Sequence, residues 1–237
     1  MASSYNLPGG FKRIYHYHIR KTGGTSINAM FLSLAGEDGQ SNYRQLNSSR
    51  NHRLILDDKV FVGWNPKLIN QGHYLYAFSH LPAHQLRLPP DTFTITCLRD
   101  PLKRLISLYN MLHEQKNEGG IHPGFKYQKP YLRESFYDFV HAIPEEERYN
   151  QLYMFSKRLN IDEALQTIQQ CDVYFFSDAF NEGIAAINHK LGLKLTPLHI
   201  RAGHHYESMD PSSIKAVREM LKPEYCLLDQ LRSIRIR

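Results

Sequence analysis

Near its N-terminus the chain reads as a β-strand that runs into a pair of glycines and then into a helix. Residues 13–19 are rich in β-branched and aromatic side chains, and Gly23 and Gly24 follow shortly after. Over residues 25–35 the apolar side chains recur at helical spacings of three and four, and Thr25 or Ser26 is placed to cap the helix start. This order is typical of a parallel sheet covered by helices.

The rest of the chain continues to alternate strand and helix patterns. Further strands are expected at residues 74–79, 93–98 and 172–177, and helices are expected to start at Pro101, Pro144, Asp178 and Pro211. Residues 36–70 are polar and show no sustained period. We therefore expect a long loop region with only a short element of regular structure around residues 59–64. The pattern predicts an α/β fold, a parallel β-sheet flanked by helices. We expect one domain over residues 1–237, with residues 1–10 as a flexible N-terminus.

The glycine loop has the composition of an anion-binding site. It reads Lys21, Thr22, Gly23, Gly24, Thr25 and Ser26. The glycines let the backbone approach an anion, the N–H groups at the helix start face it, and Lys21, Thr25 and Ser26 add a charge and two hydroxyl donors. The sequence therefore predicts phosphate binding at this loop.

The loop differs from the phosphate loop of nucleotide triphosphatases. That loop requires glycine, four residues, then glycine and lysine followed by serine or threonine, so its lysine comes after the glycines. Here Lys21 precedes Gly23 and Gly24, and the standard pattern occurs nowhere in the chain. Hydrolysis of ATP or GTP is therefore disfavoured.

A second candidate anion site follows the strand expected at residues 93–98. Arg99 stands before Asp100 and Pro101, which together favour a helix start, and Ser107 lies eight residues after Arg99. Eight residues are about two helical turns, so the guanidinium and the hydroxyl return to nearly the same face and can converge on one anion. Two such sites suit a nucleotide that carries phosphates at both ends.

The segment from His18 to Ser26 resembles the 5′-phosphosulfate loop of carbohydrate sulfotransferases of the heparan sulfate 2-O- and 6-O-sulfotransferase type. Those enzymes use 3′-phosphoadenosine 5′-phosphosulfate (PAPS) and leave adenosine 3′,5′-bisphosphate (PAP). The resemblance implies a P-loop-like sulfotransferase fold, with Lys21 and residues 22–26 on the phosphosulfate and Arg99 and Ser107 on the 3′-phosphate. It also implies that no metal is needed. Arg20 stands where members of that family usually have proline.

Sulfuryl transfer resembles phosphoryl transfer, in which the acceptor hydroxyl is helped by a general base. His80 is the candidate, because it directly follows the strand expected at residues 74–79 and ligands of parallel sheets bind at the carboxyl ends of strands. The resembling family has a catalytic histidine at the same point. His84 is close enough in sequence to compete for the role.

Several weaker patterns leave alternatives open. Arg201 and Gly203 resemble part of the Arg-Lys-Gly element with which cytosolic sulfotransferases contact the 3′-phosphate, and an ordinary surface loop explains them equally well. The pair Asn150 and Gln151 resembles a family element, and an exposed helix face explains it equally well. His16 and His18 alternate on one strand, but no carboxylate or cysteine lies at ligand spacing, so no metal site is predicted.

Composition limits the classes of partner. The chain has 29 basic and 23 acidic residues and a net charge of +6, which favours an anionic ligand. The basic residues are spread along the chain, so nucleic-acid binding is not predicted. No apolar run approaches the roughly 20 residues of a membrane span. Three widely spaced cysteines favour a cytoplasmic protein, although a Golgi enzyme trimmed of its anchor would look similar.

The sequence therefore predicts a PAPS-dependent sulfotransferase that acts on a hydroxyl or amine of a carbohydrate or small natural product. A P-loop-like kinase, with Asp100 as its only candidate Mg²⁺ ligand, and a non-catalytic PAP-binding module are the alternatives. The oligomeric state is not predicted. Aromatic side chains that could stack on the acceptor lie in or near candidate loops: Tyr43, Trp64, Tyr74, Phe125 and Tyr127.

Overall fold

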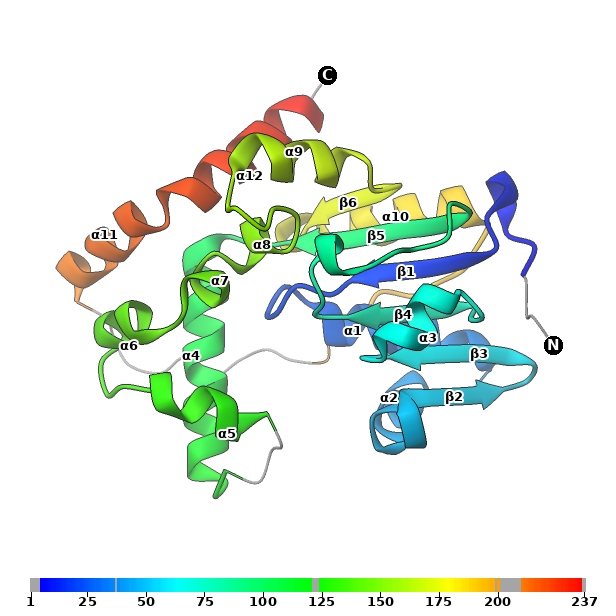
Figure 1. Ribbon diagram of the computed structural model, residues 1–237, viewed down its shortest axis with the longest axis horizontal. Coiled ribbons are helices and arrows are strands. Elements are labelled where there is room, and N and C mark those ends of the chain that lie inside the picture. The colour runs from blue at the N-terminus through cyan, green and yellow to red at the C-terminus, as the bar shows by residue number, and fades with distance from the viewer. Residues whose placement is uncertain (1–4, 37, 121–123, 199, 201–209, 236–237) are drawn as a thin grey trace.

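A computed structural model of the protein describes residues 5–36, 38–120, 124–198, 200 and 210–235. Its centre is a six-stranded sheet (Figure 1). In spatial order the strands are β2 (Arg53–Leu56), β3 (Lys59–Gly63), β4 (Tyr76–Ser79), β1 (Arg13–Tyr17), β5 (Thr92–Leu98) and β6 (Val173–Phe176). All neighbours pair in parallel except β2 with β3. The predicted α/β fold with a mostly parallel sheet is confirmed.

The central strand β1 fixes the register of the sheet. Tyr15 of β1 lies opposite Ala77 of β4 on one side and Thr94 of β5 on the other. Because β1, β4 and β5 run in the same direction, their carboxyl ends meet at one edge of the sheet. The four strands predicted from the sequence begin or end within two residues of the expected positions.

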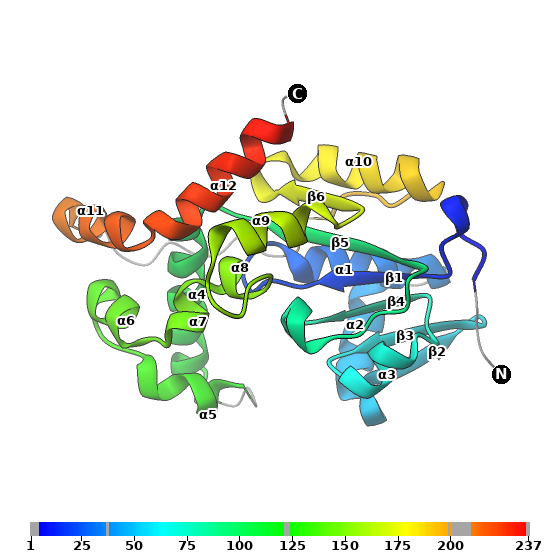
Figure 2. The ribbon, with the colours of Figure 1, turned by 45° about the horizontal axis from the view of Figure 1, so that its top comes forward.

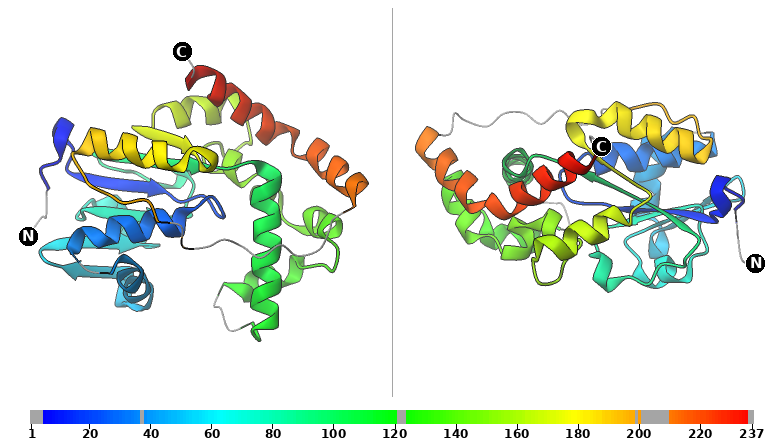
Figure 3. Two further views of the ribbon diagram at one scale, coloured as in Figure 1. Left: turned by 180° about the vertical axis from the view of Figure 1, so that it is seen from behind. Right: turned by 90° about the horizontal axis from the view of Figure 1, so that it is seen from above.

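Helices cover both faces of the sheet, as Figures 2 and 3 show. Helices α1 (Gly24–Leu32), α2 (Gly39–Ser48) and α10 (Phe180–Leu191) pack on one face, against side chains such as Ile14 and Phe175. The other face is covered by α3 (Pro66–Gln71), α8 (Asn150–Tyr153), α9 (Ile161–Gln169) and α12 (Lys222–Arg235). Side chains of the central strand β1 alternate between the two cores, with Ile14 in one and Tyr15 in the other, as the period of a strand requires.

A separate group of helices faces the carboxyl ends of the strands. The long helix α4 (Pro101–Asn117) packs with α6 (Phe136–Ala142) and α11 (Pro211–Met220) around a third apolar cluster that includes Leu105, Phe139 and Val217 (Figure 1). The short helices α5 (Phe125–Gln128) and α7 (Glu145–Arg148) complete this group. Single 3₁₀ turns lie at Pro8–Gly10, Ser33–Ala35, Arg50–His52, Ala83–Gln85, Lys129–Tyr131 and Ser177–Ala179.

Residues 36–70 hold more regular structure than the sequence predicted. They form α2, β2, β3 and α3. Helix α2 is capped by Asp38, whose carboxylate accepts a hydrogen bond from the Gln40 N–H at 3.0 Å. Only a narrow stripe of α2, including Asn42 and Leu46, is buried, and this is why its polar sequence concealed a helix.

The helix expected at Pro144 needs correction. The helix expected from Pro144 is two short helices, α7 and α8, because Tyr149 between them has a non-helical backbone (φ −102°, ψ 45°). Helix α4 begins after Asp100, as predicted, and extends to Asn117. Residues 1–10 were expected to be a flexible N-terminus; within the described part of this segment, the Tyr5 hydroxyl donates to the Asp58 carbonyl and accepts from the Val60 N–H.

In the described part of the chain, no helix has the length and apolar character needed to cross a bilayer.

Candidate functional site

The predicted site residues gather at the carboxyl ends of β1, β4 and β5. His18 follows β1, His80 follows β4 and Arg99 follows β5. A cavity of about 830 Å³ opens at this edge of the sheet, and its lining includes His18, Arg20, Lys21, Thr25 and His80. Parallel sheets bind their ligands at this edge.

The glycine loop between β1 and α1 has the backbone of an anion cradle. Gly23 (φ 95°) and Lys21 (φ 67°) both have left-handed backbone, which is unfavourable for a lysine. Helix α1 begins without a side-chain cap: Gly23 is the N-cap residue, so the expected cap by Thr25 or Ser26 is wrong. The first N–H groups of a helix have no acceptor within it, so those of residues 24–26 remain suited to a ligand.

The hydroxyls of this loop have distinct partners. Thr22 is fully buried and donates to the Ile19 carbonyl at 3.0 Å, which closes the loop on itself. The Ser26 hydroxyl accepts a hydrogen bond from the Ile200 N–H at 3.2 Å. Thr25 is half-buried and lines the cavity. Of the three, Thr22 therefore supports the loop, and Thr25 faces the space a ligand would enter.

Gly24 is required by the ring that packs on it. A Cβ atom at this position would lie 1.9 Å from Cδ2 and 2.0 Å from Nε2 of His18, far inside contact distance. Any other residue at position 24 would displace either the His18 ring or the start of α1. The second glycine of the loop therefore serves side-chain packing, while Gly23 serves backbone conformation.

His80 is oriented by a backbone carbonyl. Its Nδ1 donates to the His18 carbonyl oxygen at 2.5 Å, so the proton of the neutral ring sits on Nδ1 and the lone pair on Nε2. Trp64 and His18 flank the ring, with centroid distances of 4.6 and 4.5 Å. Burial, and then the charge of Arg20, lowers the pKa of His80 to about 3. The ring is therefore neutral at physiological pH.

The competing histidine has different surroundings. His84 is exposed in a 3₁₀ turn and packs its ring edge-on against Tyr153 at a centroid distance of 5.3 Å. It is not part of the cavity lining among the described residues. His80 and His84 thus lie in different environments although four residues separate them.

Arg99 connects the second predicted motif to the glycine loop. Its Nη1 donates to the Lys21 carbonyl at 2.9 Å, and its side chain is half-buried. Asp100 caps α4 by accepting from the Lys103 N–H at 2.8 Å, as predicted. Ser107 is half-buried on α4, four residues before Met111, which lines the cavity from the same stripe of the helix.

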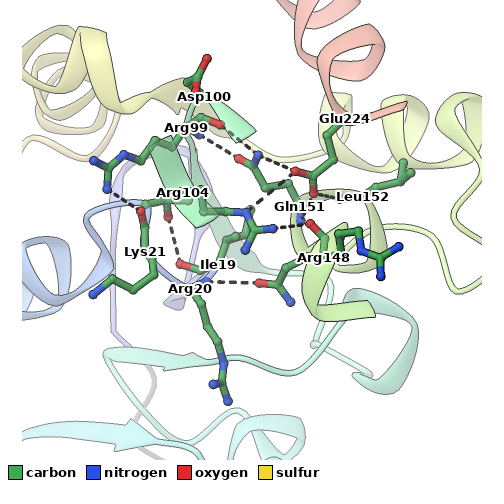
Figure 4. A network of polar contacts seen from close by, with 12 residues as sticks. Ile19, Arg20, Lys21, Arg99, Asp100, Arg104, Arg148, Gln151, Leu152 and Glu224 are labelled. Atoms are coloured by element: carbon green, nitrogen blue, oxygen red, sulfur yellow. Dashed lines mark hydrogen bonds and ion pairs between the residues drawn. The ribbon is translucent and has the colours of Figure 1, made fainter. Parts of the chain in front are cut away.

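A buried polar network behind these motifs was missed by sequence reasoning (Figure 4). The side chain of Gln151 accepts from the Arg99 N–H at 2.8 Å and donates to the Arg99 carbonyl at 2.9 Å. Glu224 of α12 accepts from the Gln151 N–H at 2.7 Å and lies 3.8 Å from Arg104 Nε. Gln151, Glu224 and Arg104 are all fully buried, so an exposed helix face does not explain Gln151.

Asn150, the neighbour of Gln151, holds the first loop. Its side-chain oxygen accepts from the backbone N–H of Arg20 at 3.3 Å, and Asn150 is 8% exposed. A proline at position 20, usual in the resembling family, has no N–H to donate. The Arg20 side chain also lies 3.9 Å from Glu147. Two adjacent residues thus brace both anion motifs, and their only sequence signal was the Asn-Gln pair.

A second part of the cavity wall comes from residues 40–64. Tyr43, Arg44, Asn47, His52 and Trp64 all line the cavity. The Trp64 indole N–H donates to the Asn47 side chain at 2.7 Å, which fixes the indole plane. This wall combines aromatic faces with a cationic side chain.

The other aromatic candidates have different positions. Tyr74 and Phe125 are buried in apolar clusters. Tyr127 is 69% exposed and lines a smaller pocket of about 270 Å³, which shares Arg20, Gly124 and Gln128 with the main cavity.

Two remaining expectations concern metals and the late loop. Over the residues that the structure describes, no cluster of three or more histidine, cysteine, aspartate or glutamate side chains is arranged to hold a metal ion. Arg201 and Gly203 lie outside the described residues.

Comparison with known proteins agrees with this geometry. The model of the sulfotransferase family matches residues 10–192, more than half of the chain, and this segment includes the glycine loop, His80 and Arg99. Among curated proteins, no match was found. The match does not single out the heparan sulfate type. On the strength of this match and of a mostly parallel sheet flanked by helices, the chain belongs to the sulfotransferase family of enzymes.

Proposed function

We propose that the protein transfers the sulfuryl group of PAPS to a hydroxyl or amine of a carbohydrate or small natural product. The observation that carries the proposal is a neutral histidine, His80, that lines the same cavity as the glycine loop. An anion cradle and a base beside one cavity are what a transfer from an anionic donor to a hydroxyl or amine needs. Both groups lie at one edge of the sheet, at the carboxyl ends of β1 and β4.

The residues at this edge fit PAPS as a donor. PAPS supplies an activated sulfuryl group on its 5′-phosphate and a 3′-phosphate as a second anionic anchor. The N–H groups of residues 24–26 and Lys21 would hold the phosphosulfate, and Arg99 with Ser107 would hold the 3′-phosphate. Arg99 donates one N–H to the Lys21 carbonyl. A guanidinium carries five N–H donors, so others remain for a phosphate. Arg201 and Gly203 are proposed as further contacts to the 3′-phosphate.

His80 would act as the general base on the acceptor. Its Nε2 carries the lone pair and takes the proton from the acceptor hydroxyl, while Nδ1–H stays on the His18 carbonyl. The ring then becomes an imidazolium whose Nδ1 charge is stabilised by that carbonyl. Lys21 would stabilise the negative charge that develops on the 5′-phosphate of PAP as PAP leaves.

The cavity wall formed by residues 40–64 would bind the acceptor. Trp64 and Tyr43 offer aromatic faces suited to a sugar or another ring, and Trp64 lies directly beside His80. Arg44 adds a cation suited to an acidic group on the acceptor. The acceptor hydroxyl would then lie between Trp64 and the glycine loop.

A kinase, the main alternative, has less support in the site. Asp100, its candidate Mg²⁺ ligand, already accepts from the Lys103 N–H at 2.8 Å and from the Tyr225 hydroxyl at 3.3 Å. Both carboxylate oxygens are thus engaged by the protein. Lys21 also precedes the glycines, the reverse of the order in nucleotide triphosphatases.

We propose a cytoplasmic location, with the Golgi lumen as the alternative. All three cysteines are free thiols. Cys97 is buried in the sheet core, where burial raises the pKa of its thiol, whereas Cys171 and Cys226 are only partly buried. Free thiols that remain accessible are favoured in a reducing compartment.

The test combines binding with turnover. Calorimetric titration with PAP is expected to show tight binding, and ATP with Mg²⁺ to show little; the reverse result would contradict the sulfotransferase proposal and favour the kinase. His80→Ala should retain PAP binding and lose about 10²- to 10⁴-fold in sulfuryl transfer to an acceptor found by screening. His84→Ala is the matched control and should keep wild-type turnover. PAP binding without transfer to any acceptor would favour the non-catalytic module.

A further inference from the structure

A buried polar chain lies directly behind the glycine loop. It consists of His16, Asn28, Tyr76 and His18, which come from β1, α1, β4 and the loop. The first three are fully buried and His18 is 5% exposed. The rings of His16 and His18 stack, with a centroid distance of 5.2 Å and an interplanar angle of 16°. His16 Nε2 is buried without a hydrogen-bond partner in the part of the chain that the structure describes, whereas His16 Nδ1, Asn28, Tyr76 and His18 Nδ1 bond to one another, and these bonds determine where their protons sit.

Asn28 is the centre of the chain. Its side-chain oxygen accepts from the Tyr76 hydroxyl at 2.7 Å and from His16 Nδ1 at 2.9 Å. Its amide nitrogen lies 3.3 Å from His18 Nδ1. An amide nitrogen can only donate, so His18 Nδ1 is the acceptor and carries the lone pair. The proton of the neutral His18 ring therefore sits on Nε2.

The Nε2 edge of His18 lies at the start of α1. It is the edge that packs on Gly24, where a Cβ atom would come within 2.0 Å of Nε2. His18 also lines the cavity. Within the described residues, the hydrogen bonds of the His18 side chain use Nδ1 alone. A buried ring thus presents an N–H beside the uncapped N-terminus of α1.

We propose that His18 is a catalytic residue that donates its Nε2–H to the phosphosulfate group of the donor, and that Asn28 is the positioning residue that keeps this proton on Nε2. This inference rests on the proposed sulfotransferase function, since it names a further contact to the same donor. Lys21 then supplies a full charge to the donor and His18 supplies a neutral, fixed hydrogen bond.

The neutrality of His18 matters because of its neighbour. The ring centroids of His18 and His80 are 4.5 Å apart. His80 becomes positively charged when it takes the proton from the acceptor hydroxyl. A cationic His18 would oppose that step by like-charge repulsion. Burial, and then the neighbouring His80, His16, Arg20 and Lys21, lowers the pKa of His18, in line with a neutral donor.

The first experiment reads the tautomers in the ligand-free protein. Histidine ring ¹⁵N shifts, measured by NMR and assigned with the His18→Asn and His80→Ala variants, should show His18 protonated on Nε2 and His80 protonated on Nδ1. A His18 ring protonated on Nδ1 would overturn the proposal. The measurement requires neither PAPS nor an acceptor substrate.

The second experiment uses two amide replacements at position 18. In His18→Gln the amide nitrogen can take the place of Nε2, whereas in His18→Asn it takes the place of Nδ1. We expect His18→Gln to retain most of the turnover and His18→Asn to lose about 10- to 100-fold, the loss expected for a hydrogen bond to a charged group. Wild-type turnover in both variants would overturn the proposal.

A third variant tests Asn28 without touching the donor. Asn28→Asp offers only acceptor oxygens, so it should move the His18 proton to Nδ1, seen in the ¹⁵N spectrum, and lower kcat about 10-fold or more. Tyr76→Phe is the control: it leaves the His16 and His18 contacts of Asn28 and should change kcat less than about 3-fold. An unchanged His18 tautomer in a folded Asn28→Asp protein would contradict the role of Asn28.

The outcomes separate this inference from the proposed function. If the wild-type protein does not bind PAP, the proposed function fails and the inference falls with it, whatever the tautomer. If PAP binds and His80→Ala abolishes transfer while both His18 replacements keep full turnover, the proposed function stands and the role of His18 is wrong.

Discussion

The two anion motifs lie side by side at one edge of the sheet, yet the protein builds them differently. The glycine loop is shaped by neighbours in sequence: Gly23 and Gly24 set its path, and Thr22 closes it on Ile19. The Arg99 junction is held by Gln151 and Glu224, 52 and 125 residues further along the chain. The path of the loop is thus set by nearby residues, although Asn150 and Arg99 also bond to its backbone, whereas the junction depends on the completed fold.

The difference extends to how each motif satisfies its polar groups. The loop leaves the first N–H groups of α1 without a side-chain cap and keeps Lys21 in left-handed backbone, which costs about 1 to 2 kcal/mol. At the junction, Gln151 pairs with both backbone groups of Arg99, and Asp100 caps α4. The loop is therefore arranged for a ligand, whereas the junction is arranged for stability with one guanidinium reaching the loop.

The largest expected effect tests the dependence of the junction on the fold. Glu224→Ala removes the partner of the Gln151 N–H and leaves Arg104 as a buried cation without its carboxylate. We expect the free energy of unfolding to fall by about 3 to 5 kcal/mol, measured by urea denaturation. Asp229→Ala, an exposed acid on the same helix, is the control and should change it by less than about 0.5 kcal/mol. Equal effects would remove the contrast between the two motifs.

The second prediction tests the loop as a site built for a ligand. Lys21→Ala should lower turnover about 10²- to 10³-fold and weaken PAP binding much less, because the lysine charge is needed most where negative charge develops. Lys103→Ala, an exposed cation on α4, should leave both unchanged. Turnover equal to wild type would exclude Lys21 from the mechanism.

The contrast also explains what the sequence was able to predict. The strands, the glycine loop and the helix start at Asp100 depend on periodicity, glycine and capping, all of which are local signals. The buried pair Arg104 and Glu224 depends on α12 returning to the site from the far end of the chain. No periodic pattern distinguishes a buried glutamate from an exposed one, so the network around Gln151 required the structure.

The cap of α1 and the helix α2 were mispredicted for related reasons. Thr25 and Ser26 are good capping residues, but the left-handed Gly23 takes the N-cap position and leaves them inside the helix. Helix α2 buries only a narrow stripe, so its polar composition resembled a loop. In both cases tertiary packing decided between options that the local sequence allowed.

The third prediction separates two roles of Arg99. If it serves the 3′-phosphate, Arg99→Ala should weaken PAP binding about 10- to 100-fold and hardly affect adenosine 5′-phosphosulfate, which has no 3′-phosphate. Its bond to the Lys21 carbonyl suggests a further, smaller effect on the loop. Calorimetry with both nucleotides measures the two roles, and Lys103→Ala is again the control. A uniform loss for both nucleotides would assign Arg99 to support of the loop alone.

The last prediction concerns acid, and it belongs to the loop side of the comparison. Burial lowers the pKa of His16 to about 4 and that of His80 to about 3, below the value of about 6.5 for an unfolded histidine. The folded state therefore holds both rings neutral, while the unfolded state takes up protons as the pH falls below 6.5. The contribution of these neutral rings to the free energy of unfolding is therefore present above pH 6.5 and is lost as the pH falls toward 4. The loss is up to about 1.4 kcal/mol per pH unit for each ring.

Replacing one of these rings should reduce that dependence. His16→Gln lacks a titrating group, so its free energy of unfolding should fall less steeply between pH 6.5 and 4.5 than that of the wild type, by up to about 1.4 kcal/mol per pH unit. His141→Gln, at an exposed position in α6, should keep the wild-type slope. Parallel slopes for the wild type and His16→Gln would mean that acid acts elsewhere, and the histidine chain behind the loop would not be the acid-sensitive part of the site.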